Sequence, residues 1–267
     1  MTKTKLMGIL NVTKDSFFEK GKYFDSDQAI ERALEIAKQG ADILDIGGES
    51  TRPGAQPVTE EEELKRVIPV IQALKNAISI PISIDTSKLN VAAQAIDAGA
   101  SLINDVTGFQ HPEMQDIALT SGVTICVMHM QGTPQTMQQN PDYPEEITAY
   151  LLHWFEERIE LLLKKGIKKQ QIILDPGIGF GKTVAHNVAI IENLPKLKTL
   201  GFPLLIGLSR KSFMGKILQR NTTDLLPSTL IMNGLAIQGG ADIIRVHDVA
   251  EHRQVIDLLA GLTTRVY

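Results

Sequence analysis

Eight short apolar runs along this chain end in polar or otherwise distinctive residues, and this recurrence is the first sign of a functional site. In chain order these residues are Asn11, Asp45, Asp85, Asn104 with Asp105, Met128 with His129, Asp175, the segment GLSRKS that begins at Gly207, and Arg245 with His247. A single aspartate after an apolar run is as often a turn residue as a ligand. Turn chemistry is a much weaker explanation when eight runs end in this way.

Carboxylate and amide groups dominate one part of this set. Asp85, Asn104 and Asp175 supply such groups, and we expect few cations among them. Donors and acceptors of this kind suit the edge of a neutral, flat heterocycle. Lys211 can add one cation to the pocket, and Met128 can pack against the face of the ring. These residues therefore predict a binding site for a flat, polar ring.

A second part of the set is suited to phosphate. Arg245 and His247 follow the last apolar run, and they would lie beside Asn11 of the first run in a closed barrel. Barrels often bind phosphate near their last two strands, and arginine binds phosphate oxygens well. Asn11 offers a neutral oxygen to Mg²⁺, which needs few protein ligands when phosphates supply the rest. Irregular segments add a third group, comprising Phe17, Thr51, Arg52 and Ser212.

The segment DPGIGFGKT, from Asp175 to Thr183, ends like a phosphate-binding P-loop. A P-loop has a glycine five residues before its last glycine, but Pro176 stands at that position here. Proline has no N–H group, whereas a phosphate cradle is built from N–H groups. We therefore disfavour nucleotide binding at Lys182 and expect Lys182→Ala to leave activity largely intact.

The elements that would carry these residues repeat one local pattern, in which a helix-like stretch ends in glycine and an apolar run follows. The glycines are Gly40, Gly99, Gly122, Gly166, Gly201 and Gly240. Glycine adopts the left-handed conformation that ends a helix without a Cβ clash, and the β-branched runs suit buried parallel strands. Thr59 with Glu62 predicts a capping box at one helix start, and Ser87 predicts an N-cap at another.

Two further runs, KLMGILN and IPISID, bring the strand candidates to eight, and helical segments alternate with them. This alternation indicates an α/β fold, and eight of each element favour a (β/α)8 TIM barrel over an open sheet. The length of 267 residues suits such a barrel, and no linker-like segment divides the chain. We predict one domain over residues 1–267, with long irregular segments at 12–25, 47–58 and 129–144. Its site would lie at the carboxyl ends of the strands.

Composition argues against several other classes of protein. The net charge of −4 does not favour a nucleic-acid surface. The one cysteine, Cys126, lies in an apolar run, so no disulfide can form within the chain, which suits a reducing cytoplasm. The first apolar run is too short for a signal peptide, and no run approaches the roughly 20 residues of a membrane span. We therefore expect a cytoplasmic protein that binds small molecules rather than nucleic acid or membranes.

The motifs around these residues resemble those of the dihydropteroate synthase family, the folate-pathway enzymes that sulfonamides inhibit. The resemblance is carried by MGILNVTKDSF, DIGGESTRPGA, SIDT, INDVTG, VMHMQGTPQTMQ, LDPGIGFGKT, GLSRKS and RVHDV, and it covers essentially the whole chain. No single motif is specific, but together they are. The resemblance implies a transferase built on a pterin-binding barrel, with Mg²⁺ as cofactor and a homodimer as the typical assembly.

The resemblance also implies a reaction. The family condenses 6-hydroxymethyl-7,8-dihydropterin diphosphate with 4-aminobenzoate to give 7,8-dihydropteroate and diphosphate. The step is dissociative and carbocation-like, and cations with Mg²⁺ stabilise the charge that develops on the departing anion. An aromatic amine needs no strong base to attack a cation, which agrees with the lack of any recognisable catalytic triad in the sequence.

Transferred motif by motif, the resemblance implies roles for individual residues. The pterin would contact Asp85, Asn104, Val106, Met128, Asp175, Gly207, Lys211 and Arg245. The 4-aminobenzoate side would comprise Phe17, Thr51, Pro53, Phe180 and Ser212. Diphosphate would be held by Asn11, Thr51, Arg52, Arg245 and His247, with Asn11 also on the metal. The groups that act on the reacting atoms would be Asp15, Arg52, Lys211, Arg245 and His247.

The first loop departs from the family pattern. The family reads roughly N-V-T-P-D-S-F-S-D-G-G, whereas this chain reads NVTKDSFFEKG. Lys14, Phe18, Glu19 and Lys20 are the altered positions, while Asn11, Asp15 and Phe17 are retained. The departures put the loop's dynamics and its sulfonamide affinity in question, but not the reaction.

Two other functions stay open at this point. A pterin-dependent methyltransferase on a similar barrel would share the pterin-binding acids and amides. It has no use for a diphosphate cluster or for the NVTxDSF and STRPGA loops. An inactive pterin-binding module would bind the pterin tightly without turnover, but the intact set of charged residues counts against it. Release of diphosphate on mixing the two substrates separates both from a synthase.

Overall fold

The computed structural model describes residues 4–13, 18–19, 23–24, 26–50, 55–220 and 225–264. Within these residues, parallel strands form one eight-stranded sheet in the order β8-β7-β6-β5-β4-β1-β10-β9. Their bounds are β1 (Lys5–Asn11), β4 (Ile43–Gly47), β5 (Ile82–Asp85), β6 (Leu102–Asp105), β7 (Thr124–Met128), β8 (Ile172–Asp175), β9 (Leu205–Ile206) and β10 (Ile243–Val246). A parallel bridge between Leu174 and Leu204 joins the two ends of the sheet and closes the ring.

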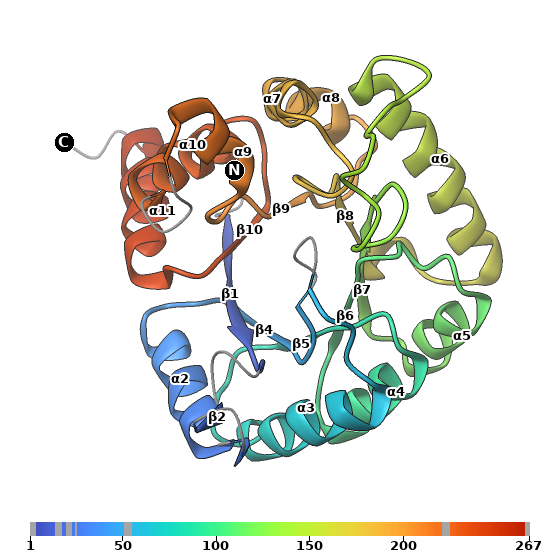
Figure 1. Cartoon of the computed structure of the whole chain (residues 1–267), viewed down its shortest axis with the longest axis vertical. Helices are drawn as coiled ribbons and strands as arrows, with labels where there is room; N and C mark the ends of the chain where they lie inside the picture. Colours follow the sequence, from blue (N-terminus) through green and yellow to red (C-terminus); the bar gives the residue numbers. More distant parts are fainter. Residues whose placement is uncertain are drawn as a thin grey trace.

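Helices surround this ring on its outside (Figure 1). They are α2 (Ser26–Lys38), α3 (Glu60–Leu74), α4 (Leu89–Ala98), α5 (Pro112–Ser121), α6 (Ile147–Lys165), α7 (Val184–Glu192), α8 (Leu194–Lys198), α9 (Ser212–Leu218), α10 (Leu226–Gln238) and α11 (Val249–Thr264), with the 3-10 turn η1 (Lys169–Gln171) before β8. Every strand expected from the sequence is present, and the predicted (β/α)8 barrel is confirmed.

The six glycines that were expected to end helices all lie in the left-handed region of the backbone. Their φ angles are +96° at Gly40, +132° at Gly99, +69° at Gly122, +105° at Gly166, +74° at Gly201 and +101° at Gly240. A residue with a Cβ is strained in this region, whereas glycine is not. These positions therefore let each helix stop and the chain turn into the next strand.

The two predicted helix starts differ in outcome. The Thr59 hydroxyl accepts a hydrogen bond from the Glu62 backbone N–H at 3.3 Å, as an N-cap should. The Glu62 carboxylate, however, accepts from the Arg66 guanidinium at 2.9 Å. The expectation that Ser87 caps α4 is wrong, because Lys88 is the N-cap and its N–H donates to the Thr86 hydroxyl at 3.2 Å.

One of the expected irregular segments contains regular structure. Within residues 12–25, β2 (Phe18–Glu19) pairs antiparallel with β3 (Tyr23–Phe24). The aromatic residues in FFEKGKYF favour extended backbone, which accounts for this short hairpin. Residues 129–144 carry no helix or strand, as predicted.

Strand alternation divides the core into two regions. One set of side chains fills the barrel interior and comprises Met7, Ile43, Leu102, Cys126, Ile173, Leu205 and Ile243. Their sequence neighbours, such as Leu6, Leu44 and Ile103, belong to the larger core between the strands and the helices. Successive strand side chains point to opposite faces, so the barrel interior receives every second residue. Cys126 is buried and unpaired, as predicted.

Candidate active site

The candidate site is built from the interior residues one step nearer the carboxyl ends of the strands. Two residues beyond the apolar interior layer, the strands place Ile9, Asp45, Asp85, Asn104, Met128, Asp175, Gly207 and Arg245. Six of these eight are residues predicted to contact the pterin. The alternation of strand side chains therefore directs the predicted ring-binding groups into one layer at the carboxyl face of the barrel.

Arg245 joins three strands of this layer. Its Nε donates to Asp45 Oδ2 at 2.5 Å, and its Nη2 donates to Asp85 Oδ2 at 2.5 Å. Asn104 Nδ2 also donates to Asp45 Oδ2, at 3.3 Å. The expectation of few cations around Asp85 is thus wrong, because the guanidinium extends from β10 to the carboxylates of β4 and β5.

Asp45 is the main residue that the sequence analysis left without a role. It is fully buried and is bound by both Arg245 and Asn104. The signal was available, since Asp45 ends an apolar run in the same way as Asp85. Its Oδ1 atom, together with Asn104 Oδ1 and Ser83 Oγ, has no hydrogen-bond partner among the described residues. Buried polar atoms are usually paired, so these atoms indicate capacity to bind a ligand or water.

Burial raises the pKa of two aspartates in the layer, Asp85 and Asp175. It raises the pKa of Asp85 to about 7, while the charge of Arg245 acts in the opposite direction and that of Asp45 adds to the rise. Burial likewise raises the pKa of Asp175, against the Gly177 N–H and the charges of Lys211 and Arg245. Burial alone would lower the pKa of Arg245, but the charges of Asp45 and Asp85 outweigh it and raise that pKa.

An apolar wall lies beside the polar layer. Val106, Met128, Met137 and Phe180 form one buried cluster, with Met130 packed against it. Lys211 Nζ lies 4.3 Å from the centre of the Phe180 ring, a distance that suits a cation–π contact. Phe180 was expected on the 4-aminobenzoate side, but it packs with Val106, Met128 and Lys211, which were assigned to the pterin. The structure therefore brings an apolar surface next to the carboxylates and amides.

The residues predicted to bind phosphate lie in the neighbouring part of the barrel. β10 pairs with β1, which places the Arg245–His247 segment beside the strand that ends in Asn11. The Ser209 hydroxyl lies 2.9 Å from His247 Nδ1 and accepts from the His247 backbone N–H at 3.2 Å. Ser209 was not singled out from the sequence, although it lies in the GLSRKS motif. It orients the imidazole that was predicted to bind diphosphate.

The remaining predicted residues fall into two sets. Ser212 is exposed as the first residue of α9, directly after Lys211, which is the N-cap of that helix. Gly207 follows β9 next to open space, since a Cβ added there would meet no atom within 4 Å. The positions outside the described residues are Asp15, Phe17, Thr51, Arg52 and Pro53, and also Lys14 and Lys20 of the altered first loop.

The P-loop interpretation finds no support in the placement of Lys182. Its side chain is turned into the protein, where Nζ donates to the Phe180 carbonyl at 3.0 Å and to the His129 carbonyl at 3.3 Å. Only 3% of Lys182 is exposed. The glycines of this segment, Gly177, Gly179 and Gly181, have positive φ and form turns packed against the loop that follows β7.

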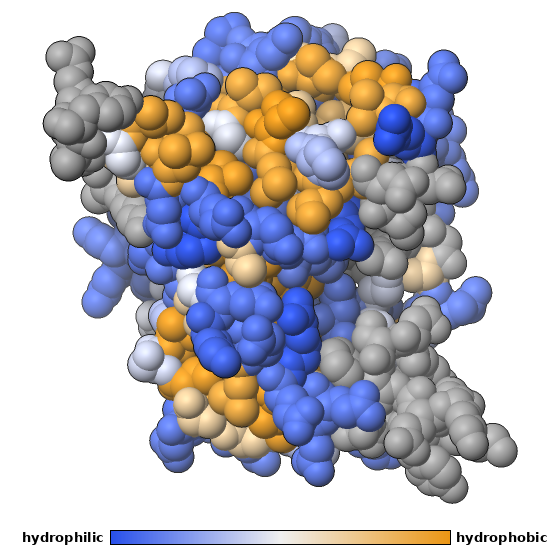
Figure 2. Space-filling model, turned by 90° about the vertical axis from the view of Figure 1, so that its left-hand side faces the viewer, coloured by the Kyte–Doolittle hydropathy of each residue, from blue (hydrophilic) through white to orange (hydrophobic). Residues whose placement is uncertain are grey.

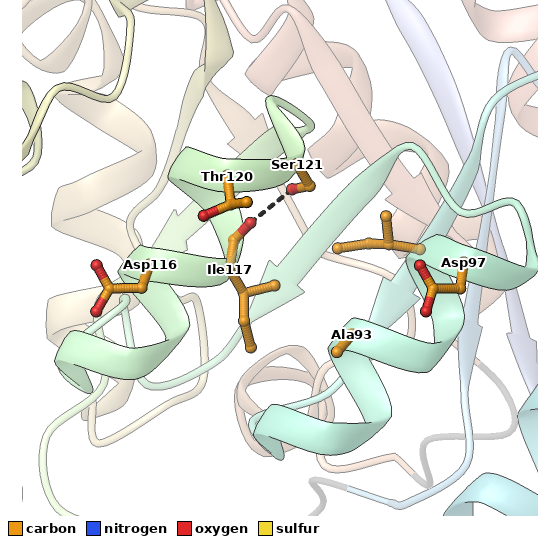
Figure 3. A pocket seen from close by; sticks show the side chains of 7 residues that line it. Ala93, Asp97, Asp116, Ile117, Thr120 and Ser121 are labelled. Carbon is orange, nitrogen blue, oxygen red and sulfur yellow. Dashed lines mark hydrogen bonds between the residues drawn. The ribbon is translucent and has the colours of Figure 1, made fainter.

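A separate groove lies on the outer surface of the barrel between α4 and α5 (Figure 3). It is lined by Ala93, Ile96, Asp97, Asp116, Ile117, Thr120 and Ser121. The Ser121 hydroxyl donates to the Ile117 carbonyl of its own helix at 2.7 Å. None of the predicted site residues lines this groove, so it is not part of the candidate active site.

Two further features bear on metals and membranes. Within the described part of the chain, no three His, Cys, Asp or Glu residues are arranged to hold a metal ion. Among the described residues, no helix is both long and apolar enough to cross a bilayer.

Comparison with known proteins identifies the family. The sequence profile of the pterin binding enzyme family matches residues 7–247. The dihydropteroate synthase of Synechocystis sp. is 48% identical over 262 residues, which are 97% of this chain and 90% of the relative. The dihydropteroate synthase of Escherichia coli K12 is 43% identical over 92% of this chain and 87% of the relative.

Solved structures extend the agreement to the fold. The dihydropteroate synthase of Yersinia pestis, in complex with a sulfonamide drug, has a TM-score of 0.92 at 41% identity and covers 98% of this chain and 95% of its own. The Xanthomonas albilineans enzyme with 4-aminobenzoic acid has a TM-score of 0.92 at 40% identity, covering 98% of this chain and 94% of its own. This chain, a pterin binding enzyme by its barrel and profile, belongs to the dihydropteroate synthase family.

Proposed function

We propose that the carboxyl face of this barrel condenses 6-hydroxymethyl-7,8-dihydropterin diphosphate with 4-aminobenzoate to give 7,8-dihydropteroate and diphosphate. The observation that carries the proposal is the buried polar layer around Asp45, Asp85 and Arg245, which has unpaired hydrogen-bonding atoms and adjoins an apolar wall. A second Xanthomonas albilineans structure, 37% identical to this chain with a TM-score of 0.89, holds 7,8-dihydropteroate. Membership of the same family supports the same product here.

The pterin ring is proposed to bind edge-on to the polar layer. Asp85, Asn104 and Asp175 would hydrogen-bond its donor and acceptor groups, and Lys211 would add a cation. The faces of the ring would pack on Val106 and Met128, and the open space beside Gly207 leaves room for it. An ionised carboxylate accepts hydrogen bonds more strongly than a neutral one, so the nearby cations favour binding.

The diphosphate is proposed to lie between β10 and β1. Arg245 and His247 would stabilise the leaving group, and Ser209 would hold the His247 ring in orientation. Mg²⁺ is the expected cofactor here, with Asn11 as a ligand, and it would supply positive charge to the departing diphosphate. The methylene carbon–oxygen bond breaks with its electron pair on diphosphate. The amine nitrogen then forms the new carbon–nitrogen bond and loses a proton to solvent.

The second substrate is proposed to enter over the polar layer after the pterin. Ser212 is exposed on that side and Phe180 lies at the boundary of the apolar wall. Phe17, Thr51 and Pro53 complete this side by family resemblance, with Asp15 and Arg52 acting near the reacting atoms. The Yersinia pestis relative binds a sulfonamide drug, and we propose that sulfonamides compete for the same place in this chain.

A homodimer is proposed as the assembly. Figure 2 shows apolar side chains gathered on the face that carries α10 and α11. The exposed residues are Ile231 and Leu235 on α10 and Leu258 and Leu262 on α11, with Ile217 and Leu218 on α9. A spacing of four residues puts the two residues of α10 on one face of that helix, and likewise the two of α11. A contiguous apolar patch of this kind is typical of a protein–protein interface.

Sedimentation equilibrium tests the assembly. The wild type should sediment at twice the chain mass of 29.3 kDa, and the variant Ile231→Glu with Leu258→Glu should sediment as a monomer. Leu161→Glu, at an exposed leucine on α6, is the matched control and should stay dimeric. A monomeric wild type would refute the proposal.

A cytoplasmic location is proposed as well, in keeping with the lone buried Cys126.

The reaction itself is tested by measuring diphosphate release with both substrates and Mg²⁺. Release that requires 4-aminobenzoate is expected of a synthase. Tight pterin binding without release would indicate an inactive pterin-binding module. Methyl transfer from a folate to a corrinoid, with no diphosphate released, would indicate the methyltransferase instead.

A further inference from the structure

The turn that follows β8 is packed against the loop that follows β7 with no spare room. A Cβ added at Gly177 would lie 1.9 Å from the His129 carbonyl oxygen, and one added at Gly181 would lie 2.7 Å from Gln131 Cβ. Tyr143 donates its hydroxyl to the Gly181 carbonyl at 2.7 Å. Two loops from neighbouring strands are thus held as one unit over the polar layer.

Lys182 connects the two loops from inside. Its Nζ donates to the Phe180 carbonyl at 3.0 Å and the His129 carbonyl at 3.3 Å, and it lies 3.0 Å from His129 Nδ1. An ammonium group has three N–H donors, and these three acceptors match them in number. The side chain is therefore committed to the loops.

His129 is shaped to receive this contact. While Lys182 is charged, Nδ1 can only accept from it, so the ring is then neutral and carries its proton on Nε2. Burial, followed by the charge of Lys182, lowers the pKa of His129 to about 2, which agrees with a neutral ring. Trp154 meets the imidazole edge-on at 5.0 Å between ring centres, and Tyr150 does so at 5.6 Å.

The turn that Lys182 fixes carries two groups of the proposed pterin site. The Gly177 N–H donates to Asp175 Oδ1 at 2.8 Å, so the position of the turn sets the orientation of that carboxylate. Phe180 lies in the apolar wall with Met128, and its ring contacts Lys211. A shift of the turn would move the carboxylate and the wall together.

The charge of Lys182 also reaches Asp175. Lys211, Arg245 and Lys182 all oppose the effect of burial on the Asp175 pKa, and the buried Cys126 thiol also interacts with this carboxylate. Burial lowers the pKa of Lys182 itself to about 7, against the charge of Asp175 and with that of Lys211. Lys182 is therefore charged below pH 7. Replacing it by a neutral residue would remove that charge and make Asp175 easier to protonate.

We propose that Lys182 is a positioning residue that ties the Gly177–Gly181 turn to His129 and thereby holds Asp175 and Phe180 in place for the pterin ring. This inference rests on the proposed function. It replaces the sequence-based expectation that Lys182→Ala leaves activity largely intact.

The test compares 6-hydroxymethylpterin binding by calorimetry from pH 5 to pH 7 in the wild type and in Lys182→Met, with urea unfolding measured in parallel. We expect at least tenfold weaker binding in the variant. We also expect the loss of binding on acidification to begin at higher pH than in the wild type, because Asp175 loses a neighbouring cation. Asp85, whose pKa is about 7, titrates in both proteins, so the comparison between them isolates the effect on Asp175. Lys164→Met, at an exposed lysine on α6 that pairs with Glu160, is the control and should change neither the affinity nor its pH dependence. Loss of stability alone would not shift the pH at which binding is lost.

A second variant covers the case in which Lys182→Met does not fold. His129→Phe keeps an aromatic ring next to Trp154 and Tyr150 and leaves the charge of Lys182 in place. It removes only the Nδ1 acceptor. It should weaken pterin binding several-fold without shifting the pH at which binding is lost. Wild-type affinity in His129→Phe, or an unchanged pH profile in Lys182→Met, would overturn the proposal. A wild type that neither binds the pterin nor releases diphosphate would refute the proposed function instead.

Discussion

Replacing Asp85 by asparagine is expected to stabilise the fold at alkaline pH while it weakens pterin binding. The Asp85 side chain is only 8% exposed at the end of β5, and burial raises its pKa to about 7 from an ordinary value of 3.8. A carboxyl whose folded pKa is raised contributes its stability fully below the unfolded pKa and loses it as the pH rises through the folded pKa. In the wild type, this contribution is therefore lost between about pH 4 and pH 7.

The size of the effect follows from the same two values. One pKa unit is worth about 1.36 kcal/mol, so the rise from 3.8 to about 7 corresponds to about 4 kcal/mol at most. Asparagine has nearly the shape of a protonated carboxyl and cannot ionise. Arg245 would lose one carboxylate but keep its hydrogen bond to Asp45, and an incompletely paired guanidinium carries a cost. We therefore expect a net gain of about 1–3 kcal/mol in the free energy of unfolding at pH 8.

Urea unfolding of the wild type and of Asp85→Asn at pH 4.5 and pH 8 measures this gain. The difference in unfolding free energy between the two proteins should widen in favour of the variant as the pH rises, because only the wild type has a buried carboxyl at position 85 to ionise. Titratable groups common to both proteins cancel in this difference. Asp97→Asn, at an exposed aspartate on α4, is the control and should show a constant difference. Pterin binding at pH 7.5 should fall at least tenfold in Asp85→Asn. A difference that stays constant with pH would mean that Arg245 keeps Asp85 ionised throughout, and the reasoning from burial would be wrong.

Three further predictions concern the turns, the phosphate group and the first loop. Gly177→Ala should lower the free energy of unfolding, measured with urea, by more than about 3 kcal/mol. Gly122→Ala, with nearly the same φ but open space around its Cβ, should lower it by about 1–2 kcal/mol. Equal losses would show that the backbone moves enough to remove the clash with the His129 carbonyl. Ser209→Ala should weaken binding of the pterin diphosphate about fivefold, the equivalent of one hydrogen bond, and leave the affinity for 6-hydroxymethylpterin unchanged. An equal loss of affinity for both ligands would argue against a role of Ser209 through His247. Lys14 lies outside the described residues, and the sequence alone predicts that Lys14→Pro lowers the apparent KM for 4-aminobenzoate about two- to fivefold, because proline reduces the conformers of the segment; steady-state kinetics with each substrate varied in turn would expose an effect on the pterin diphosphate instead.

The local features of this protein could be predicted from the sequence. The glycines at positions such as 99 and 240 were identified as helix ends, and each has the positive φ that only glycine adopts without strain. The apolar runs were identified as strands, and all eight lie in the barrel. These features depend on neighbouring residues along the chain, through backbone sterics and the alternation of strand side chains. Once the strands were placed, their carboxyl ends gave Asp85, Asn104 and Asp175 as members of one site.

The tertiary structure decided which of these side chains meet. Arg245 was grouped with His247 from its position in the chain, yet its guanidinium reaches Asp45 and Asp85, which are 200 and 160 residues away. Asp105 adjoins Asn104 in the sequence, but its carboxylate accepts from the Thr107 and Phe109 backbone N–H groups and belongs to a turn. Such choices depend on closure of the barrel and on the space around each side chain, neither of which has a local sequence signal.

Lys182 illustrates the same division. Its place after three glycines resembles the end of a P-loop, an interpretation that Pro176 disfavours. In the folded chain it is buried beneath the turn that orients Asp175, with the His129 carbonyl and imidazole among its acceptors. The three glycines favour a turn there, because glycine adopts these positive φ angles without strain. Only the packing of the β7 and β8 loops against each other determined that the lysine points inward, since a buried ammonium is stable only where the tertiary structure supplies its acceptors.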